Sequence, residues 1–395
     1  MAILNLTPFY VRGLMKTLQS APYGTLKLTT PEGEVHHFEG EKEGPSADLH
    51  IHHWDTLKQS LWRGDIGFGE TYIDGKWTTT DLPELMTYFV HNMEEVSDLC
   101  HGTWVTRRLF GIVNWLRRNT KQQSRANIKA HYDVGNSFYS LWLDESMTYS
   151  SALFSEGNAM PLQDAQRAKY ERIIGKMDKP NAEVLEIGCG WGGFAEEAAK
   201  HQHHVTGLTI SQEQYNFAQN RMAEQGLDDK VELRMQDYRD VTGLFDYIVS
   251  IEMFEAVGEK YWPAYFNTIK QRLQDSGKAI VQTITIDDSL FDDYRQRSDF
   301  IRHYTFPGGM LPSVERLKQE VESAGLKCKE VFHFGQDYAE TLRRWLHVLD
   351  DKVDDIKGLG YSDAFLRSWR FYLSCCIGAF AASRTSVVQV ELVHA

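Results

Sequence analysis

Residues 184–193 read Val-Leu-Glu-Ile-Gly-Cys-Gly-Trp-Gly-Gly, and this stretch decides the fold because an apolar strand pattern runs directly into a glycine-rich turn. A helical pattern follows over residues 194–200. Gly188, Gly190 and Gly192 carry no Cβ, so the backbone can adopt positive φ and a ligand can approach the main chain closely. A strand, a glycine turn and a helix in this order predict a nucleotide-type cofactor loop at the start of the helix.

The chain on both sides of this turn alternates between strand-like and helix-like patterns. Five apolar runs of strand length lie at residues 183–187, 204–209, 231–235, 245–250 and 278–284. Helical periodicity is clearest at residues 194–200, 212–224 and 261–273. Strands that alternate with helices form parallel sheets through right-handed crossovers. The sequence therefore predicts an α/β fold, a doubly wound Rossmann-like sheet whose ligand lies at the carboxyl ends of the strands.

Length and local pattern both indicate a second, smaller domain at the N-terminus. The 395 residues, 42% of them hydrophobic, are enough for two ordinary cores. Short alternating strands are expected at residues 25–29, 35–38 and 49–52. We therefore expect an N-terminal α+β, lipid-associated domain over residues 1–100, a basic amphipathic linker over 101–125 and the larger α/β domain over 126–395.

The predicted linker is basic, although the chain as a whole has a net charge of −13. Residues 102–125 contain no acid, and six basic residues stand among aromatic and aliphatic ones: Arg107, Arg108, Arg117, Arg118, Lys121 and Arg125. Such a segment suits a helix on an anionic membrane surface, with the two arginine pairs on the headgroups. An interdomain helix with a solvated basic face is an equally favoured alternative. The acidic total argues against nucleic acid as a partner.

The sequence indicates no metal site, disulfide framework or export signal. The five cysteines form no Cys-x-x-Cys pair, and His50, His52 and His53 fit a half-exposed strand edge better than a metal site. No apolar run reaches the roughly 18 residues of a membrane span, and the first residues lack a signal-peptide pattern. We expect a cytoplasmic protein without a metal; its oligomeric state, a homodimer included, stays open.

Several motifs together identify the family that the chain resembles. They begin at Ile128 (Ile-Lys-Ala-His-Tyr-Asp-Val-Gly-Asn-Ser-Phe-Tyr), Met147 (Met-Thr-Tyr-Ser), Gly188 (Gly-Cys-Gly-Trp-Gly-Gly), Gly207 (Gly-Leu-Thr-Ile-Ser), Gln236 (Gln-Asp-Tyr-Arg-Asp), Phe254 (Phe-Glu-Ala-Val-Gly), Phe306 (Phe-Pro-Gly-Gly-Met-Leu-Pro-Ser) and Phe334 (Phe-Gly-Gln-Asp-Tyr). Over roughly residues 60–390 the chain resembles the cyclopropane fatty acid synthase and mycolic acid methyltransferase family. The resemblance implies an enzyme that uses S-adenosylmethionine (SAM) as its cofactor.

The same resemblance implies a SAM pocket built from four segments. From the methionine end through the ribose to the adenine, the residues are Tyr149 and Ser150; Gly188, Gly190 and Gly192; Thr209, Ser211 and Gln214; and Gln236, Asp237 and Tyr238. Thr209 stands where many cofactor folds carry an acid on the ribose hydroxyls. We therefore expect Gln214, one helical turn onward, to supplement its hydrogen bonds.

The reaction that the resemblance implies begins when an acyl-chain double bond attacks the sulfonium methyl of SAM. A carbocation forms, and a base must then remove a proton. Loss from the new methyl closes a cyclopropane, whereas loss from a neighbouring carbon leaves a methylated alkene or a methylene group. The site has to exclude water and stabilise positive charge with aromatic faces and a carboxylate.

Members of the resembled family hold a bicarbonate ion as the base, and this chain retains only part of that ligand set. Glu255, Tyr338 and Ile284 match, whereas Ser151 stands where the family has cysteine and Gln282 where it has histidine. Serine and glutamine form hydrogen bonds but do not titrate near neutrality. We expect Glu255 to be the carboxylate of the reaction zone, while bicarbonate binding and cyclopropane closure stay open.

The leading hypothesis is a SAM-dependent C-methyltransferase, bound peripherally to the inner face of the membrane, that acts on unsaturated acyl chains of phospholipids. A cyclopropane, a methyl-branched chain and a methylene chain are the alternative products. Methylation of a small lipophilic molecule and catalytically silent lipid binding are the rival functions. Silent binding is disfavoured because a lipid carrier has no use for a complete glycine turn with Thr209, Gln214 and Glu255.

Overall fold

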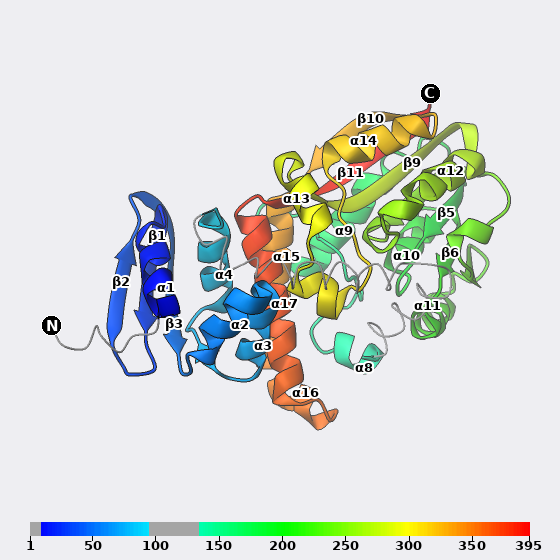
Figure 1. Ribbon diagram of the computed structural model, residues 1–395. Coiled ribbons are helices and arrows are strands. Elements are labelled where there is room, and N and C mark those ends of the chain that lie inside the picture. The colour runs from blue at the N-terminus through cyan, green and yellow to red at the C-terminus, as the bar shows by residue number, and fades with distance from the viewer. Residues whose placement is uncertain (1–8, 95–133) are drawn as a thin grey trace. The chain divides into compact units, whose positions relative to one another are not determined.

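The computed structural model describes residues 9–94 and 134–395, which fall into two units (Figure 1). Unit 1 comprises Met1–Leu116, Gln296–Thr305 and Gly360–Arg384, and unit 2 comprises Arg117–Arg295, Phe306–Leu359 and Thr385–Ala395. The glycine turn and every predicted catalytic and cofactor-binding residue belong to unit 2. The predicted linker, with Arg107, Arg108, Arg117 and Arg118, lies outside the described residues.

Unit 2 is built around a seven-stranded sheet with the order β10-β11-β9-β8-β5-β6-β7. The strands are β5 (Glu183–Ile187), β6 (His204–Thr209), β7 (Val231–Met235), β8 (Phe245–Ile251), β9 (Leu273–Ile286), β10 (Leu326–His333) and β11 (Thr385–His394). Neighbouring strands from β7 to β9 are parallel, whereas β11 runs antiparallel to both β9 and β10. The predicted α/β class is confirmed, and β10 and β11 lie beyond the five predicted strands.

Helices cover both faces of this sheet (Figure 1). The described helices of unit 2 are α8 (Asn136–Tyr139), α9 (Leu162–Ile174), α10 (Gly193–Lys200), α11 (Gln212–Glu224), α12 (Trp262–Arg272), α13 (Phe291–Gln296), α14 (Val314–Ser323), α15 (Gly335–Asp351) and α16 (Val353–Gly358). Because successive strand residues point to opposite faces, Val184 of β5 joins the core that contains Phe194 of α10. Its neighbour Leu185 joins the other core, which contains Phe266 of α12.

The strand order reverses at β5, and this reversal positions the site. From β5 the chain adds β6 and β7 on one side and β8 and β9 on the other. In a doubly wound sheet, a ligand binds outside the carboxyl ends of the strands at such a switch point. The two turns that flank it contact each other: a Cβ on Gly188, after β5, would lie 2.8 Å from Cγ of Met253, after β8.

Unit 1 contains a four-stranded sheet with the order β2-β1-β3-β4. Its strands are β1 (Tyr23–Thr29), β2 (Val35–Glu39), β3 (Lys42–Ile51) and β4 (Trp77–Thr78), and its helices are α1 (Phe9–Gln19), α2 (Asp55–Arg63), α3 (Asp65–Ile73), α4 (Leu82–His91) and α17 (Asp363–Ala381). Helix α17 packs closely on α4, since a Cβ on Gly378 would lie 2.9 Å from the main-chain carbon of Met86. In the described parts of the chain, no helix is both long and apolar enough to cross a bilayer.

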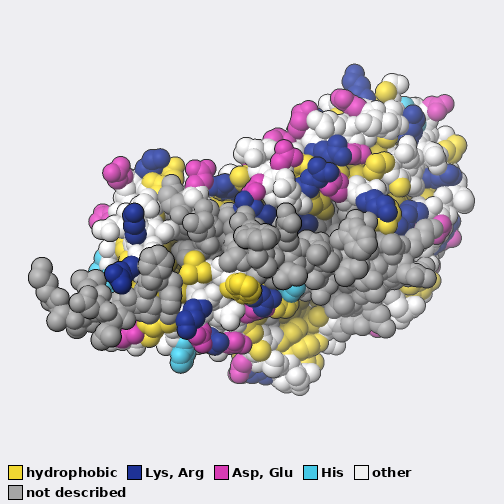
Figure 2. Space-filling view, viewed as in Figure 1, with side chains coloured by type: hydrophobic (Ala, Val, Ile, Leu, Met, Phe, Trp, Pro, Cys, Tyr) yellow, Lys and Arg dark blue, Asp and Glu magenta, His cyan; other side chains and the backbone are white. Residues whose placement is uncertain are grey.

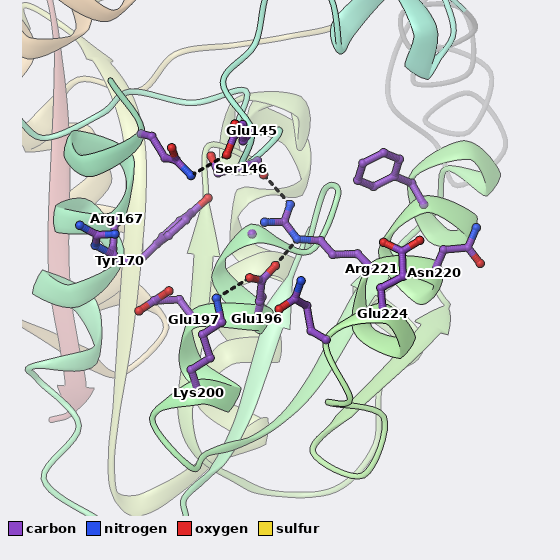
Figure 3. A pocket seen from close by; sticks show the side chains of 14 residues that line it. Glu145, Ser146, Arg167, Tyr170, Glu196, Glu197, Lys200, Asn220, Arg221 and Glu224 are labelled. Carbon is purple, nitrogen blue, oxygen red and sulfur yellow. Dashed lines mark hydrogen bonds and ion pairs between the residues drawn. The ribbon is translucent and has the colours of Figure 1, made fainter. Parts of the chain in front are cut away.

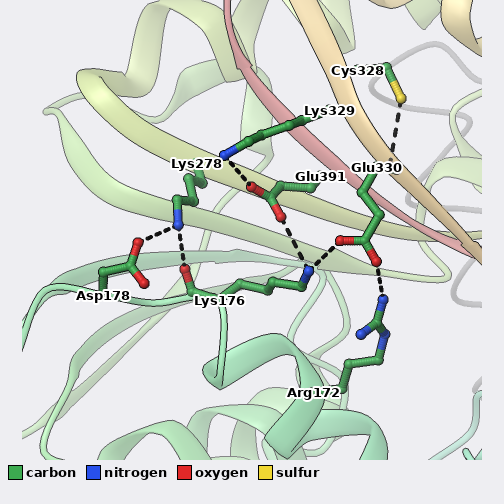
Figure 4. A network of polar contacts seen from close by, with 8 residues as sticks. All are labelled: Arg172, Lys176, Asp178, Lys278, Cys328, Lys329, Glu330 and Glu391. Atoms are coloured by element: carbon green, nitrogen blue, oxygen red, sulfur yellow. Dashed lines mark hydrogen bonds and ion pairs between the residues drawn. The ribbon is translucent and has the colours of Figure 1, made fainter.

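A network of ion pairs fastens α9 to the edge of the large sheet (Figure 4). Arg172 and Lys176, at and just after the end of α9, both pair with Glu330 of β10. Lys176 also lies 3.4 Å from Glu391 of β11, which Lys329 approaches to 3.6 Å. Glu391 is buried whereas Glu330 and Lys329 are partly or largely exposed, so the network ties the antiparallel strands to the helix layer from the interior outward.

Candidate active site

The carboxylate of Glu252 is the centre of a hydrogen-bond cluster at the carboxyl end of β8. Its Oε1 accepts from the main-chain N–H of Ser151 and from Nε2 of Gln282, each at 2.8 Å. Its Oε2 accepts from the hydroxyl of Tyr338 at 2.7 Å. Glu252 has φ +50°, a left-handed conformation that is uncommon outside glycine. The structure thus brings together three of the predicted catalytic residues, and it does so around a carboxylate that the sequence did not single out.

Other side chains hold each of these donors in place. Gln389 of β11 donates to Oε1 of Gln282 at 3.0 Å, which turns the amide of Gln282 so that its NH₂ group faces Glu252. On α15, Thr341 accepts the N–H of Ala152 at 3.1 Å, and Asp337 accepts the N–H of Phe154 at 2.8 Å. Helix α15 therefore positions both Tyr338 and the segment that begins at Ser151. Ser151 contributes its main-chain N–H, because its hydroxyl donates to the carbonyl of Ala152.

Glu255, the predicted carboxylate, lies one turn further along and has a different environment. Its Oε1 accepts from the hydroxyl of Thr283 at 3.0 Å and from the N–H of Ile284. Its Oε2 is buried and has no hydrogen-bond partner among the described residues. Burial, and then the charge of Glu252, raises the pKa of Glu255 to about 8. Glu255 is therefore mainly protonated at neutral pH.

A buried lysine lies near Glu252. Lys169 of α9 has no exposed surface and donates to the hydroxyl of Ser150 at 2.6 Å and to Oε1 of Gln166 at 2.7 Å. Burial lowers the pKa of Lys169 to about 7, and the charge of Glu252 opposes that shift. Burial also raises the pKa of Glu252, whereas Lys169 and the hydroxyl of Tyr338 act to lower it. The pKa of Glu252 is raised overall, and its hydrogen bonds and the nearby Lys169 limit the rise.

The glycine turn has the shape of a cofactor cradle. Gly190 has φ +51°, and a Cβ there would meet no atom within 4 Å, so the turn is open on that side. Gly192 has φ +87°, and its Cβ would lie 3.0 Å from Met222 and 3.2 Å from Ala218, so this glycine permits α10 and α11 to pack. The open space over Gly190, at the start of α10, suits a cofactor that contacts the main chain.

Polar side chains follow the next two strands at the same edge. Thr209 donates to Oε1 of Gln214 at 3.0 Å, so the two side chains predicted to meet the ribose contact each other. Ser211 caps α11, since its hydroxyl accepts the N–H of Gln214. After β7, the carboxylate of Asp237 accepts from Nε of Arg239 at 2.8 Å and from Nη2 at 2.6 Å.

The remaining two residues of the predicted adenine segment flank Asp237. Gln236 donates through Nε2 to the carbonyl of Asp240 at 2.8 Å. The ring of Tyr238 meets the ring of Tyr265 edge-on, with centroids 5.6 Å apart. Together with Thr209 and Gln214, these residues line the carboxyl ends of β6 and β7, which is the edge predicted for the cofactor.

Aromatic rings form a wall between the glycine turn and the Glu252 cluster, since Tyr139 contacts Trp191 of the turn at 5.1 Å. The ring of Tyr149 contacts those of Tyr139, Trp142 and Trp345 at centroid distances of 5.3 to 5.7 Å. Trp345 also meets the ring of Tyr338 at 6.2 Å, which joins this wall to the Glu252 cluster. Aromatic faces attract cations and exclude water, so the wall suits a reaction that develops positive charge on an apolar substrate.

A separate cleft of about 560 Å³ lies among α9, α10 and α11 (Figure 3). Its polar walls are tied together by ion pairs: Arg221 and Lys200 both bind the carboxylate of Glu196, and Arg221 also donates to the carbonyl of Ser146. None of the predicted catalytic or cofactor-binding residues lines it. We assign it no part in the reaction.

Comparison with known proteins identifies the family of this chain. A family model described as mycolic acid cyclopropane synthetase matches residues 119–390. Tuberculostearic acid methyltransferase UfaA1 of Mycobacterium tuberculosis is 33% identical over 95% of this chain and 89% of its own length. Cyclopropane-fatty-acyl-phospholipid synthase of Escherichia coli K12 is 36% identical over 87% of each chain. The solved structure of mycolic acid cyclopropane synthase CmaA1 with SAH and CTAB, 30% identical, superposes with a TM-score of 0.63 over 68% of this chain and 97% of that one.

The fold, the open glycine turn and these relatives define a SAM-dependent methyltransferase. The chain belongs to the mycolic acid cyclopropane synthetase family. The residues present fit SAM, because the cradle at Gly190 is open and the Thr209–Gln214 pair lies at the neighbouring strand end. The expectation of a SAM-dependent enzyme is therefore confirmed.

Two residues of the cluster escaped the sequence-based prediction. Glu252 directly follows the last residue of β8, and a polar residue at that place in a doubly wound sheet is a signal that was available. Lys169 lies on a helical face with Tyr170 and Ile173, both buried, and its pattern gave no indication that its amine would be buried with them.

Proposed function

We propose that the protein transfers the methyl group of SAM to the double bond of an unsaturated acyl chain in a membrane phospholipid. The observation that carries the proposal is the combination of two half-buried glutamates, Glu252 and Glu255, with an aromatic wall beside an open cofactor turn. An alkene that attacks a methyl donor becomes a carbocation, which needs an aromatic surface, a carboxylate and the absence of water.

Bound SAM supplies an electrophilic methyl group on a positively charged sulfur. The glycine turn and the Thr209–Gln214 pair hold the cofactor, and Tyr149 covers its methionine end. The aromatic wall of Tyr149, Trp142 and Trp345 directs the acyl chain and excludes water from the cation. A carboxylate of the cluster takes the proton that the cation must lose. The relatives include both a methyltransferase and a cyclopropane synthase, so a ring and a methylated or methylene chain are both compatible products.

The acyl chain reaches the site from a membrane surface in this proposal. On the face of the molecule seen in Figure 2, acidic and basic side chains of the described residues are intermingled. Our candidate for binding anionic lipid is the acid-free segment 102–125, with Arg107, Arg108, Arg117 and Arg118. We place the protein at the cytoplasmic face of the membrane as a peripheral enzyme.

Mass spectrometry of total fatty acids tests the proposal. The protein is expressed in a host that makes no cyclopropane fatty acids, beside the Gly190→Val variant as a control that lacks the cofactor cradle. We expect monounsaturated acyl chains to gain the mass of one CH₂ group with the wild type alone, and fragmentation separates a ring from a branch. Unchanged fatty acids contradict the proposal and favour a small lipophilic substrate or silent lipid binding.

A further inference from the structure

The carboxylate of Glu252 occupies the donors that the family resemblance assigns to a bicarbonate ion. Ser151, Gln282 and Tyr338 stand at three positions of that ligand set, and each donates to Glu252 at 2.7 to 2.8 Å. A carboxylate presents two acceptor oxygens to such donors, as bicarbonate does. We propose that Glu252 is a built-in general base that removes the proton released by the reaction, in place of a diffusible bicarbonate ion. This inference rests on the proposed function.

The two departures from the family's ligand set fit a base that is part of the chain. Gln282 has no exposed surface and is held by Gln389, so it offers Glu252 a fixed, neutral donor. An amide does not titrate, so it cannot compete with Glu252 for the proton. Ser151 donates through its main chain, a contact that does not depend on a cysteine or serine side chain. The substitutions therefore preserve the donors while Glu252 supplies the anion.

The second carboxyl group has a complementary role. Two neighbouring carboxyl groups do not both ionise readily, because their charges repel. Their different environments decide which one is ionised and which one keeps its proton. Glu252 has donors on both oxygens and a buried lysine nearby, whereas Oε2 of Glu255 has no partner among the described residues. Glu255 therefore remains protonated and offers a hydrogen-bond donor, while Glu252 is the ionised acceptor. Glu252 is also only partly buried, as a group that meets a substrate must be.

The proton and electron balance closes without a further reactant. The π electrons of the alkene form the new carbon–carbon bond as the methyl–sulfur bond breaks. Glu252 then takes a proton, and the electron pair of that C–H bond closes the ring or forms a new double bond. The protonated Glu252 returns its proton to solvent before the next turnover.

Purified enzyme in buffer freed of carbon dioxide provides the test, with SAM and vesicles of monounsaturated phospholipid as substrates. Glu252→Gln keeps the shape and removes the charge. Glu252→Gly suits the φ of +50° and leaves a space between Ser151, Gln282 and Tyr338 that a small anion can enter. Glu320→Gln is the matched control, since Glu320 is a buried carboxylate that pairs with Arg316 on α14, outside the cluster. Stabilisation against heat by SAM shows that each variant is folded and binds the cofactor.

We expect the turnover of the wild type and of Glu320→Gln to be indifferent to added bicarbonate. Glu252→Gln should lose about 100-fold or more in kcat, and Glu252→Gly should lose as much but recover part of it when bicarbonate is added. A wild-type rate that climbs with bicarbonate, or near-normal turnover by Glu252→Gln, overturns the inference. A wild type that makes no methylated chain under either condition contradicts the proposed function itself, and with it this inference.

Discussion

The hydroxyl of Tyr338 on α15 donates a 2.7 Å hydrogen bond to Oε2 of Glu252 at the end of β8. Helix α15 follows β10, one of the two strands added beyond the parallel part of the sheet. The same helix holds the segment after Ser151 through Thr341 and Asp337. The C-terminal part of unit 2 therefore completes a site whose cofactor side is built by the first strands.

Replacement of Tyr338 by phenylalanine removes one donor to Glu252 and leaves the ring against Trp345. The lost donor holds the carboxylate of Glu252 in position, so we expect kcat to fall by roughly 10- to 100-fold with KM little changed. Because the lost donor acts to lower the pKa of Glu252, the acid limb of the kcat profile should move to higher pH.

Tyr247→Phe is the matched control for this prediction. Tyr247 lies near the start of β8, away from the carboxyl edge, and its hydroxyl accepts the N–H of Lys179 at 2.9 Å. We expect this variant to keep the wild-type pH profile. An unmoved acid limb in Tyr338→Phe would show that its hydroxyl does not tune the base.

A valine at Gly190 should abolish SAM binding, because its side chain would fill the open side of the turn. Gly226 lies in the loop before β7, at the amino ends of the parallel strands and so on the far side from the cradle. It has φ +63°, and a Cβ there would also meet no atom within 4 Å. Gly226→Val therefore carries a similar backbone strain without touching the cradle. SAM at 100 times its Kd should stabilise the wild type and Gly226→Val by about 2.7 kcal/mol, and Gly190→Val not at all. Normal SAM titration by Gly190→Val would refute the assignment of the cradle.

The buried Glu186 of β5 should make stability depend on pH. Burial raises its pKa to about 8 from 4.5, so between these values the folded state holds a proton that the unfolded state has released. Stability is then lost as the pH rises through this window, by at most about 1.4 kcal/mol per pH unit. The free energy of unfolding of Glu186→Gln, measured with denaturant, should rise relative to that of the wild type as the pH rises. An exposed residue of the same strand provides the control, Glu183→Gln, which should show no such trend; a trend shared by both variants would argue against Glu186 as its source.

Charge reversal at Arg107, Arg108, Arg117 and Arg118 should weaken binding to anionic vesicles, by roughly 1 kcal/mol for each residue near the surface. SAM affinity should not change. Reversal of four exposed lysines of unit 2 is the control for net charge: Lys260, Lys270, Lys327 and Lys357. Equal sedimentation with vesicles for the two quadruple variants would indicate that the segment 102–125 has no special affinity for lipid.

The parallel core of the fold could be predicted from sequence because its strands carry the strongest local patterns. The expected ranges for β5, β6, β7 and α11 coincide with the observed ones, since each is a short apolar or amphipathic run bounded by polar residues or glycine. Strands β10 and β11 were harder to predict. β10 has a partly exposed burial pattern, and the long buried run of β11 acquires its place only through pairing with β9.

The contacts of the site could be predicted from sequence only where the two residues are close together in the chain. Thr209 and Gln214 are five residues apart in sequence, so a helix turn already implied their contact. The partners of Glu252 come from positions 101, 30 and 86 residues away, and only the folded sheet brings them together. The position of Glu252 directly after β8 marks it as a candidate, but the sequence does not show which donors it meets.

The central claim is most directly tested by following the methyl group itself. The purified protein is given SAM with a trideuterated methyl group and vesicles of monounsaturated phospholipid, and the extracted lipids are analysed by mass spectrometry. We predict deuterium within the acyl chain, in an amount that matches the S-adenosylhomocysteine formed. Retention of two deuterons indicates that the proton left from the new methyl, and retention of three that it left from a neighbouring carbon. S-adenosylhomocysteine without labelled acyl chains, or label confined to the headgroup, would contradict the account.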